Sequence, residues 1–240
     1  MFKNKKEMSG KTKILIVEDE KAIRGGLLDV FIYHGYAVET ADDGHAGLAK
    51  ASTGQFDLVL LDVMLPGING FDILKQVREQ DREMAIIMLT AKSTDEDIIE
   101  GLSLGADDYV AKPFSITQLV LRVEAVLRRT LPAQNHAPMI ELDDTLKLDT
   151  QNLCADIHGQ KISFTRREMD VLEYLHLHHE RPVPREELLA KVWGYARNLE
   201  LETRTVDIHI AKLRRKIEPA PASPIYLLTI RGAGYRLLSR

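Results

Sequence analysis

Acidic, hydroxyl and ammonium side chains in the first half of the chain each stand just after a short apolar run. They are Glu18, Asp19, Asp62, Thr90 and Lys112. Carboxylate oxygens are ligands that Mg²⁺ prefers, and a carboxylate can accept a phosphoryl group as an aspartyl phosphate. An ammonium and a hydroxyl stabilise the charge that a phosphoryl group carries during transfer. These residue types indicate a Mg²⁺ and phosphoryl site, with Asp62 as the candidate nucleophile.

The apolar runs alternate with helical stretches, which predicts parallel strands joined by crossover helices. The predicted strands are residues 14–17, 37–40, 58–61, 86–89 and 109–111. The helices predicted between them include residues 22–34, 45–52, 70–79 and 96–104. In such α/β sheets the ends of the strands line the functional crevice. A doubly wound parallel sheet therefore gathers the five dispersed side chains at one edge.

The composition and the pattern of apolar residues change after Arg129. Residues 130–138 contain two prolines among mostly small or polar residues, which predicts a linker. Beyond it, short alternating runs predict a small antiparallel sheet, followed by three helices and a hairpin turned at residues 231–234. The predicted strands are residues 140–142, 146–148, 153–157, 161–163, 226–230 and 235–238, and the helices are residues 166–178, 185–193 and 204–217.

Charge and composition narrow the classes of function. The net charge of the 240 residues is −4, but residues 1–129 carry 16 Lys and Arg against 21 Asp and Glu, whereas residues 203–240 carry 8 against 2. An acidic first half suits a cation site, and a basic end suits a polyanion.

The single Cys154 excludes an intramolecular disulfide and suits a reducing cytoplasm. The sequence shows neither a signal peptide nor an apolar stretch of membrane-spanning length, so we expect a cytoplasmic protein.

Four motifs in the first half resemble the receiver domain of bacterial two-component response regulators. They are residues 14–20, 57–67, 89–91 and 105–114. The resemblance implies a flavodoxin-like (βα)₅ fold in which Asp62 accepts phosphate from a sensor histidine kinase. It also implies that Glu18, Asp19, Asp62 and the backbone carbonyl of Met64 hold Mg²⁺, and that Lys112 contacts the phosphoryl group. The Lys112–Pro113 peptide is expected to be cis.

Two enzyme or cofactor classes share parts of this pattern. Haloacid-dehalogenase-like phosphatases also use an aspartyl nucleophile after a strand, but they have a second acid two residues later, where this chain has Met64. A flavin-binding module favours a phosphate-binding loop after the first strand, where residues 18–20 are acidic and would repel phosphate. A receiver-type phosphatase or scaffold with an incidental basic domain stays open as the alternative function. A metal cluster at His176, His178 and His179 is disfavoured because no acid or cysteine is spaced to complete it.

The helix predicted at residues 204–217 is basic and amphipathic. Val206, Ile210, Leu213 and Ile217 form one apolar stripe that is expected to pack inward. Polar and basic residues, with Ile208, lie on or beside the opposite face, which suits a helix that enters the DNA major groove. The Thr165 to Glu168 spacing predicts a capping box at the start of an earlier helix.

Motifs in the second half resemble the winged-helix effector of the OmpR/PhoB family of response regulators. They lie at residues 164–168, 193–194, 204–210, 213–216 and 229–236. The resemblance implies a smaller α+β winged helix-turn-helix domain that binds double-stranded DNA. The implied DNA-contacting residues are Arg204, Thr205, Ile208, His209, Lys212, Arg214 and Arg231. Among them, Ile208 and Lys212 face bases, Arg231 enters the minor groove, and the loop 195–202 contacts RNA polymerase.

The two resemblances together imply a phosphorylation-dependent transcription regulator. Its domains are expected at residues 11–129 (receiver), 130–138 (linker) and 139–240 (winged helix). Thr90 and Tyr109 are the expected switch pair, and phosphorylation promotes a homodimer whose face includes Asp107, Asp108 and Arg122. Three positions depart from the charges common on that face and should weaken the dimer: Glu100, Gln118 and Glu124.

Overall fold

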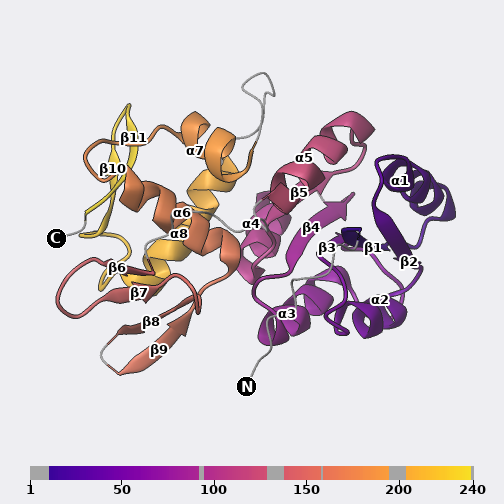
Figure 1. Ribbon diagram of the computed structural model, residues 1–240, viewed down its shortest axis with the longest axis horizontal. Coiled ribbons are helices and arrows are strands. Elements are labelled where there is room, and N and C mark those ends of the chain that lie inside the picture. The colour runs from indigo at the N-terminus through magenta and orange to yellow at the C-terminus, as the bar shows by residue number, and fades with distance from the viewer. Residues whose placement is uncertain (1–10, 92–94, 129–137, 158, 195–203, 239–240) are drawn as a thin grey trace.

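The first half of the protein is a parallel five-stranded sheet in the order β2-β1-β3-β4-β5 (Figure 1). The computed structural model describes residues 11–91, 95–128, 138–157, 159–194 and 204–238. The strands are β1 (Lys13–Val17), β2 (Ala37–Ala41), β3 (Leu58–Asp62), β4 (Ala85–Thr90) and β5 (Asp108–Ala111). The helices are α1 (Lys21–Tyr33), α2 (Gly44–Ala51), α3 (Gly70–Gln80), α4 (Asp95–Leu104) and α5 (Ile116–Arg128). The predicted doubly wound fold is confirmed.

Apolar side chains cover both faces of this sheet, which is why its strands read as nearly continuous apolar runs. Ile14 and Ile16 of β1 pack with Phe31 of α1 and with α5 on one face. Leu15 and Val17 point to the other face and pack with Leu74 of α3. The strand period of two residues therefore assigns successive side chains of one strand to two separate cores.

The second half combines an antiparallel sheet, three helices and a hairpin. The sheet has the order β6-β7-β8-β9, and the hairpin pairs β10 with β11. The strands are β6 (Met139–Glu141), β7 (Lys147–Asp149), β8 (Cys154–Ile157), β9 (Gln160–Ser163), β10 (Leu227–Ile230) and β11 (Gly234–Leu237). The helices are α6 (Arg166–Leu177), α7 (Arg185–Val192) and α8 (Arg204–Ile217). The predicted α+β winged-helix architecture is confirmed.

Local sequence signals place two of these helices. Thr165 caps α6, and Glu168 completes the predicted capping box by accepting a hydrogen bond from the Thr165 backbone N–H at 2.8 Å. The predicted stripe of α8 is buried in the second core, where Val206 and Leu213 are fully covered. The cap therefore fixes where α6 begins, and the stripe fixes which face of α8 turns inward.

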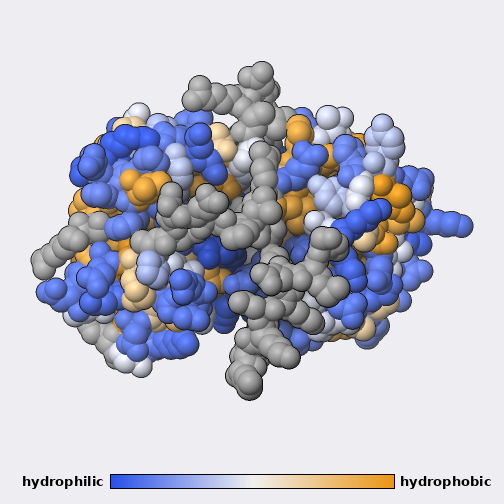
Figure 2. All heavy atoms as spheres, in the orientation of Figure 1, coloured by the Kyte–Doolittle hydropathy of each residue, from blue (hydrophilic) through white to orange (hydrophobic). Residues whose placement is uncertain are grey.

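The two halves lie against each other as two lobes, with α4 of the first packed on α8 of the second (Figure 1). Figure 2 shows a mainly hydrophilic face over both lobes, with apolar side chains in small scattered groups. Nearly all of the predicted linker and the whole loop 195–202 lie outside the described residues. Within the described part of the chain, no helix has the length and apolar character needed to span a membrane.

Candidate functional site

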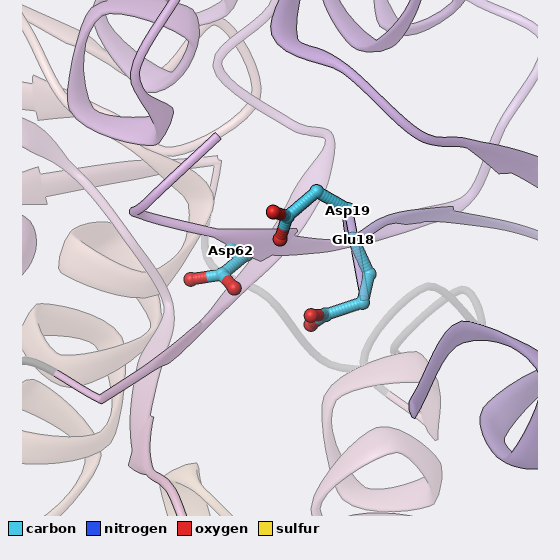
Figure 3. Close-up of side chains that lie close together, drawn as sticks. All are labelled: Glu18, Asp19 and Asp62. Atoms are coloured by element: carbon cyan, nitrogen blue, oxygen red, sulfur yellow. The ribbon is translucent and has the colours of Figure 1, made fainter. Parts of the chain in front are cut away.

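Three carboxylates meet at the carboxyl end of the parallel sheet. β1 and β3 pair with Val17 opposite Leu61, so Glu18 and Asp62 occupy the adjoining positions where the two strands end. Ligand oxygens of Glu18, Asp19 and Asp62 lie within 4.8 Å of one another, and the side chains turn toward a common space (Figure 3). Glu18 and Asp62 are buried, whereas Asp19 is exposed.

Lys112 follows β5 and bridges two of these acids. Its Nζ lies 2.6 Å from Asp62 Oδ2 and 2.9 and 2.7 Å from the two carboxylate oxygens of Glu18. Burial alone would lower the pKa of Lys112, but the hydrogen bonds and charges of the two acids outweigh it and raise that pKa. Burial, reinforced by the charge of Asp62, raises the pKa of Glu18 against the opposing effect of Lys112. The Lys112–Pro113 peptide is cis, as the resemblance implied.

Backbone contacts hold the acids at the sheet edge. The Arg24 guanidinium donates to the carbonyl oxygens of Glu18 at 2.6 Å and Asp19 at 2.8 Å, so it fixes the turn after β1. A Cβ on Gly70 would lie 2.1 Å from the carbonyl oxygen of Asp62, so the first turn of α3 approaches the end of β3 only with glycine there.

The donor set at this edge suits a hard divalent cation. Mg²⁺ binds proteins through one or two carboxylates and completes its shell with water and phosphate oxygens. Asp19 and Met64 line a cleft of about 560 Å³ beside the acids, which leaves room for such ligands. The Met64 backbone N–H also donates to Asp62 Oδ1 at 3.1 Å, which fixes the loop that follows β3. Across the described residues, this is the only group of potential metal-ligating side chains drawn together in this way.

Thr90 and Tyr109 form a buried pair on the two strands that follow β3 in the sheet. Thr90 ends β4 and is fully buried, and its side chain is hydrogen-bonded to that of Tyr109 on the neighbouring strand β5. Burial raises the pKa of Tyr109 to about 12, so the phenol is protonated at neutral pH. A Cβ on Gly101 would lie 3.0 Å from the Tyr109 ring, which shows how closely the ring approaches α4. The tyrosine is therefore turned inward.

The predicted DNA-contacting residues occupy two different environments. Arg204, at the start of α8, and Arg231, in the turn of the β10–β11 hairpin, are exposed. Arg214 donates to a carbonyl oxygen of β10 at 2.8 and 2.7 Å and ties the hairpin to α8. Ile208 and His209 are only 8% and 2% exposed, and Ile208 belongs to the hydrophobic cluster of the first domain. The sequence pattern placed both residues on or beside the outer face of α8, but here the first domain covers Ile208, and His209 is enclosed within its own domain.

His209 is enclosed by groups from its own domain. Its Nδ1 lies 2.9 Å from the carbonyl oxygen of Thr205, and its ring meets the edge of Trp193 with centroids 5.0 Å apart. Burial lowers the pKa of His209 to about 4, and the nearby charges of Lys212 and Arg167 act in the same direction. The imidazole is therefore neutral at physiological pH.

Glu168 joins the capping box of α6 to the basic face of α8. Its carboxylate lies 2.8 Å from the Lys212 ammonium and 2.6 Å from that of Lys216. Burial opposes ionisation, but the two ammonium groups outweigh it and lower the pKa of Glu168 to about 2. Lys212 also reaches the carbonyl oxygen of Leu102 in α4, at 3.4 Å. A residue predicted to read DNA thus has protein partners in this arrangement.

The charges predicted for a dimer face have partners within one chain. Asp108 lies 2.6 Å from Arg122, and Asp107 lies 3.0 Å from Arg78. Both aspartates are buried, at 0% and 2% exposed. Any dimer that uses these groups must therefore form around pairs that already exist.

Two residues at the junction of the domains had no role in the sequence-based prediction beyond belonging to motifs of the second half. The Trp193 indole N–H donates to the carbonyl oxygen of Asp107 at 3.1 Å, and Arg167 Nε lies 3.9 Å from Asp107 Oδ1. Trp193 and Arg167 are fully buried. A lone tryptophan and an arginine beside a capping box were visible in the sequence, but nothing local identified their partner in the other domain.

Comparison with protein families gives one match for each domain. The family described as "Response regulator receiver domain" matches residues 14–124. The family described as "Transcriptional regulatory protein, C terminal" matches residues 159–237. Each match lies within one of the two folded units.

Curated relatives match the chain over nearly its full length. Sensory transduction protein RegX3 of Mycobacterium tuberculosis (strain ATCC 25618 / H37Rv) is 38% identical over 227 residues, which cover 94% of this chain and 99% of the relative. The alkaline phosphatase synthesis transcriptional regulatory protein PhoP of Bacillus subtilis (strain 168) is 42% identical over 233 residues, with 94% and 96% covered.

Solved structures match both domains. A mutant of RitR is 27% identical with a TM-score of 0.74, and the match covers 95% of this chain and 100% of that one. The response regulator DrrB, described as a Thermotoga maritima OmpR/PhoB homologue, is 31% identical with a TM-score of 0.50, and the match covers 96% and 100%. The higher score over a whole two-domain chain indicates that RitR shares the placement of the domains as well as their folds.

Proposed function

The chain belongs to the OmpR/PhoB family of two-component response regulators, and we propose that Asp62 is the residue through which phosphorylation controls it. The single observation that carries the proposal is the position of the Asp62 carboxylate. It is buried at a strand end beside Glu18 and Asp19, and 2.6 Å from the Lys112 ammonium. As a family member the protein is a phosphorylation-dependent regulator of transcription that works with a sensor histidine kinase.

In this proposal Asp62 attacks the phosphorus of a phosphohistidine in the kinase. A carboxylate oxygen forms the new P–O bond while the P–N bond breaks, and the histidine leaves. Lys112 already contacts Asp62 and shifts to a phosphoryl oxygen, whose charge its ammonium balances. The Thr90 hydroxyl, at the end of the adjacent strand, donates to the same group.

Glu18, Asp19, Asp62 and the backbone carbonyl of Met64 would hold Mg²⁺, which supplies further neutralisation of the phosphoryl oxygens when bound. Three carboxylates near one ammonium leave a surplus of negative charge, which supports this assignment. When bound, the cation would also offset repulsion between the acids and an incoming phosphoryl group.

The winged-helix domain makes double-stranded DNA the output partner, with RNA polymerase and a second copy of the chain as further partners in this family. We propose that Arg204, Thr205, Ile208, His209, Lys212, Arg214 and Arg231 contact DNA, and that the dimer face includes Asp107, Asp108 and Arg122. We take residues 11–129, 130–138 and 139–240 as receiver, linker and effector. Work on chromosomal DNA, together with the single cysteine, supports the cytoplasm as its location.

We propose no independent catalytic turnover for this chain. The position two residues after Asp62, which carries the general acid in the related class of aspartyl phosphatases, is Met64. Its side chain carries no group that can donate a proton to a leaving oxygen. The site is therefore suited to hold a phosphoryl group as a signal.

Labelling with a small phosphodonor and Mg²⁺ tests the acceptor. Intact-mass spectrometry should show the gain of one phosphoryl group in the wild type and no gain in Asp62→Asn. Asp42→Asn is the matched control. Asp42 is an exposed aspartate that does not belong to the acidic group, and its ion pair with Arg24, at 3.9 Å, is long. If Asp62→Asn is still labelled, another residue is the acceptor and the proposal fails.

A further inference from the structure

The β10–β11 hairpin is bound to the recognition helix α8 along one flank of that helix. Asp207, Arg214 and Glu218 recur at helical spacing, so they form a polar stripe on α8 and at its end. This polar stripe lies beside the apolar stripe that packs inward, rather than in the middle of the face predicted to read DNA. Each of its three side chains contacts the hairpin or the residues that lead into it.

Glu218 stands directly after the last residue of α8, where a carboxylate is disfavoured. The C-terminal end of a helix carries partial negative charge, which repels an acid. Glu218 is nevertheless only 7% exposed. Its carboxylate accepts from three successive backbone N–H groups, at 2.7 Å (Ile225), 3.0 Å (Tyr226) and 2.6 Å (Leu227). These donors compensate the buried charge and hold the start of β10 against the end of α8.

Leu227 is held through both of its backbone polar groups. The preceding residue is hydrogen-bonded across the hairpin, so Leu227 turns its own N–H and carbonyl oxygen to the outer edge of β10. There the N–H meets Glu218, and the carbonyl oxygen accepts two bonds from Arg214, at 2.8 and 2.7 Å. Arg214 also donates to Thr229 Oγ1 at 2.7 Å. Side chains of the polar stripe thus occupy this edge of the strand.

Asp207 holds the other strand of the hairpin, close to its turn. Its Oδ1 accepts from the Tyr235 hydroxyl at 2.6 Å, and Tyr235 lies four positions after Arg231. Arg185 of α7 donates to the same oxygen at 2.6 Å and to the Tyr235 hydroxyl at 2.9 Å. The Arg185 guanidinium also covers the Tyr235 ring, 4.8 Å from its centroid. The polar stripe therefore fixes both strands of the hairpin, one at its base and the other near its turn.

The two proposed DNA contacts lie on the two elements that the polar stripe joins. A helix in the major groove and an arginine in the minor groove bind together only if their spacing matches the duplex. A fixed spacing presents both contacts at once, whereas a loose one adds an entropic cost to the second contact. Residues 218–226 connect α8 to β10, and a connection of this length does not fix the hairpin by itself.

We propose that Asp207 and Glu218 are positioning residues for DNA recognition. They bind the hairpin to α8 so that Arg231 is presented to the minor groove while α8 lies in the major groove. Arg214 shares this role through its bonds to β10. The role in recognition rests on the DNA contacts of the proposed function, whereas the fixed spacing of hairpin and helix does not.

A distance measurement tests the fixed spacing in the full-length protein without DNA. Spin labels are attached to Arg215→Cys on α8 and to Arg231→Cys in the turn of the hairpin, two positions that are exposed. Cys154→Ser first removes the single native cysteine. Pulsed electron paramagnetic resonance should then give one narrow distribution of distances, because the labelled segments form one rigid unit.

The polar stripe is removed at both ends by Asp207→Ala and Glu218→Gln. Glutamine keeps the shape of Glu218 but turns an amide toward backbone donors in place of one acceptor oxygen. The double variant should broaden the distribution, since a segment with few fixed contacts samples many positions. Glu180→Gln, at an exposed glutamate of the same domain, is the matched control and should leave it narrow.

Circular dichroism and urea unfolding check that each variant is folded. If the double variant does not fold, the two single variants replace it, and each should broaden the distribution in part. A folded variant set whose distribution stays as narrow as that of the control overturns the proposal.

A double-mutant cycle with Arg231→Ala tests whether the fixed spacing serves recognition. Binding is measured on a duplex selected by the wild-type protein, with beryllofluoride and Mg²⁺ present to mimic a phosphoryl group. Arg231→Ala should weaken binding by about tenfold in the wild type and in Glu180→Gln. In the double variant Arg231→Ala should weaken binding by less than about twofold, because a loosened hairpin presents the arginine poorly even before it is removed.

The remaining outcomes separate the positioning role from the DNA contacts themselves. A tenfold effect of Arg231→Ala in the double variant as well would overturn the proposal, because the hairpin then reaches the groove unaided. A changed base preference in Asp207→Ala with a narrow distribution would also overturn it, since Asp207 would then read a base. If Arg231→Ala has no effect in the wild type, the minor-groove contact of the proposed function fails. Weaker binding and a broadened distribution in the double variant would still support the positioning role in that case.

Discussion

Asp107 shows how one residue acquires several partners that its sequence context does not reveal. Its carboxylate accepts from the Ile86 backbone N–H at 2.8 Å and from Arg78 at 3.0 Å, and its carbonyl oxygen accepts from Trp193. An aspartate with this many partners is fixed in orientation, since buried charges are stable only when they are paired and hydrogen-bonded. The position predicted for a dimer face thus serves, in this arrangement, as the anchor between domains.

Lys212 and Arg204 should make different contributions to DNA binding. Lys212 lies in the middle of α8 and is predicted to face bases, whereas Arg204 lies exposed at the start of α8 and is predicted to contact DNA phosphates. Lys212→Ala should flatten sequence preference by about 1–3 kcal/mol at one base position, and Arg204→Ala should weaken all sequences alike and reduce the salt slope by about one. Selection from a random duplex library with the beryllofluoride-loaded protein, followed by titrations in salt, measures both effects. An equal loss on selected and random DNA for Lys212→Ala would reverse its assignment.

Two helices of the effector domain are joined at the element scale by one buried carboxylate. Glu168 accepts from the backbone at the start of α6 and from Lys216 of α8, and it also pairs with Lys212. The capping box is a local interaction that contributes about 1 kcal/mol. The ion pairs with the two lysines add long-range interactions between Glu168 and α8. The start of α6 and the recognition helix α8 are therefore coupled through this carboxylate.

Glu168→Gln should lower the free energy of unfolding of the effector by about 3 kcal/mol, because it leaves two partly buried ammonium groups without their anion. The folded-state pKa of Glu168, about 2, lies below the 4.5 of an unperturbed glutamate. Its contribution is therefore complete above pH 4.5 and is lost as pH falls from 4.5 toward 2. Urea unfolding at several pH values measures both effects, with the exposed Glu180→Gln as control. A pH-independent difference between the two variants would contradict the ionic explanation.

At the scale of the whole molecule, the face that α4 and β5 form on the receiver has two competing uses. Here it binds the chain's own α8, and in the proposed active state it meets a second copy. The departure of Glu100, Gln118 and Glu124 from the charges common on that face is expected to weaken the second use. If the proposed dimer uses this face, closure and dimerisation exclude each other, and a change in the stability of one shifts the other.

Light scattering should show a monomer for the unmodified chain and twice that mass with beryllofluoride and Mg²⁺. Chelation of Mg²⁺ should return the monomer if the three acids hold the cation. Asp62→Asn, which lacks the acceptor carboxylate, provides the control and should stay monomeric under both conditions. An unchanged monomer in wild-type protein shown by fluorine NMR to carry beryllofluoride would reject the coupling of site to dimer.

The sequence by itself determined the elements and the chemistry at their ends. Alternating apolar runs and helical stretches predicted the (βα)₅ sheet, with strand bounds that differ from the observed ones by at most one residue at each end. The Thr165 capping box and the apolar stripe of α8 were equally readable. These features depend on periodicity and on neighbours a few residues apart, so the local sequence is enough to predict them. The order of parallel strands then placed Glu18, Asp62 and Lys112 together.

Only the tertiary structure decided which residues of the two domains contact each other. Trp193 meets Asp107 across 86 positions, and Lys212 meets Leu102 across 110. No periodicity links residues so far apart, because such contacts arise from the fit of two complete surfaces. The amphipathic pattern of α8 specified its inward stripe but could not distinguish an outer face open to DNA from one covered by another domain. The sequence therefore determined which residues form the proposed phosphoryl site and which helix is proposed to read DNA, and packing decided that the receiver covers part of that helix.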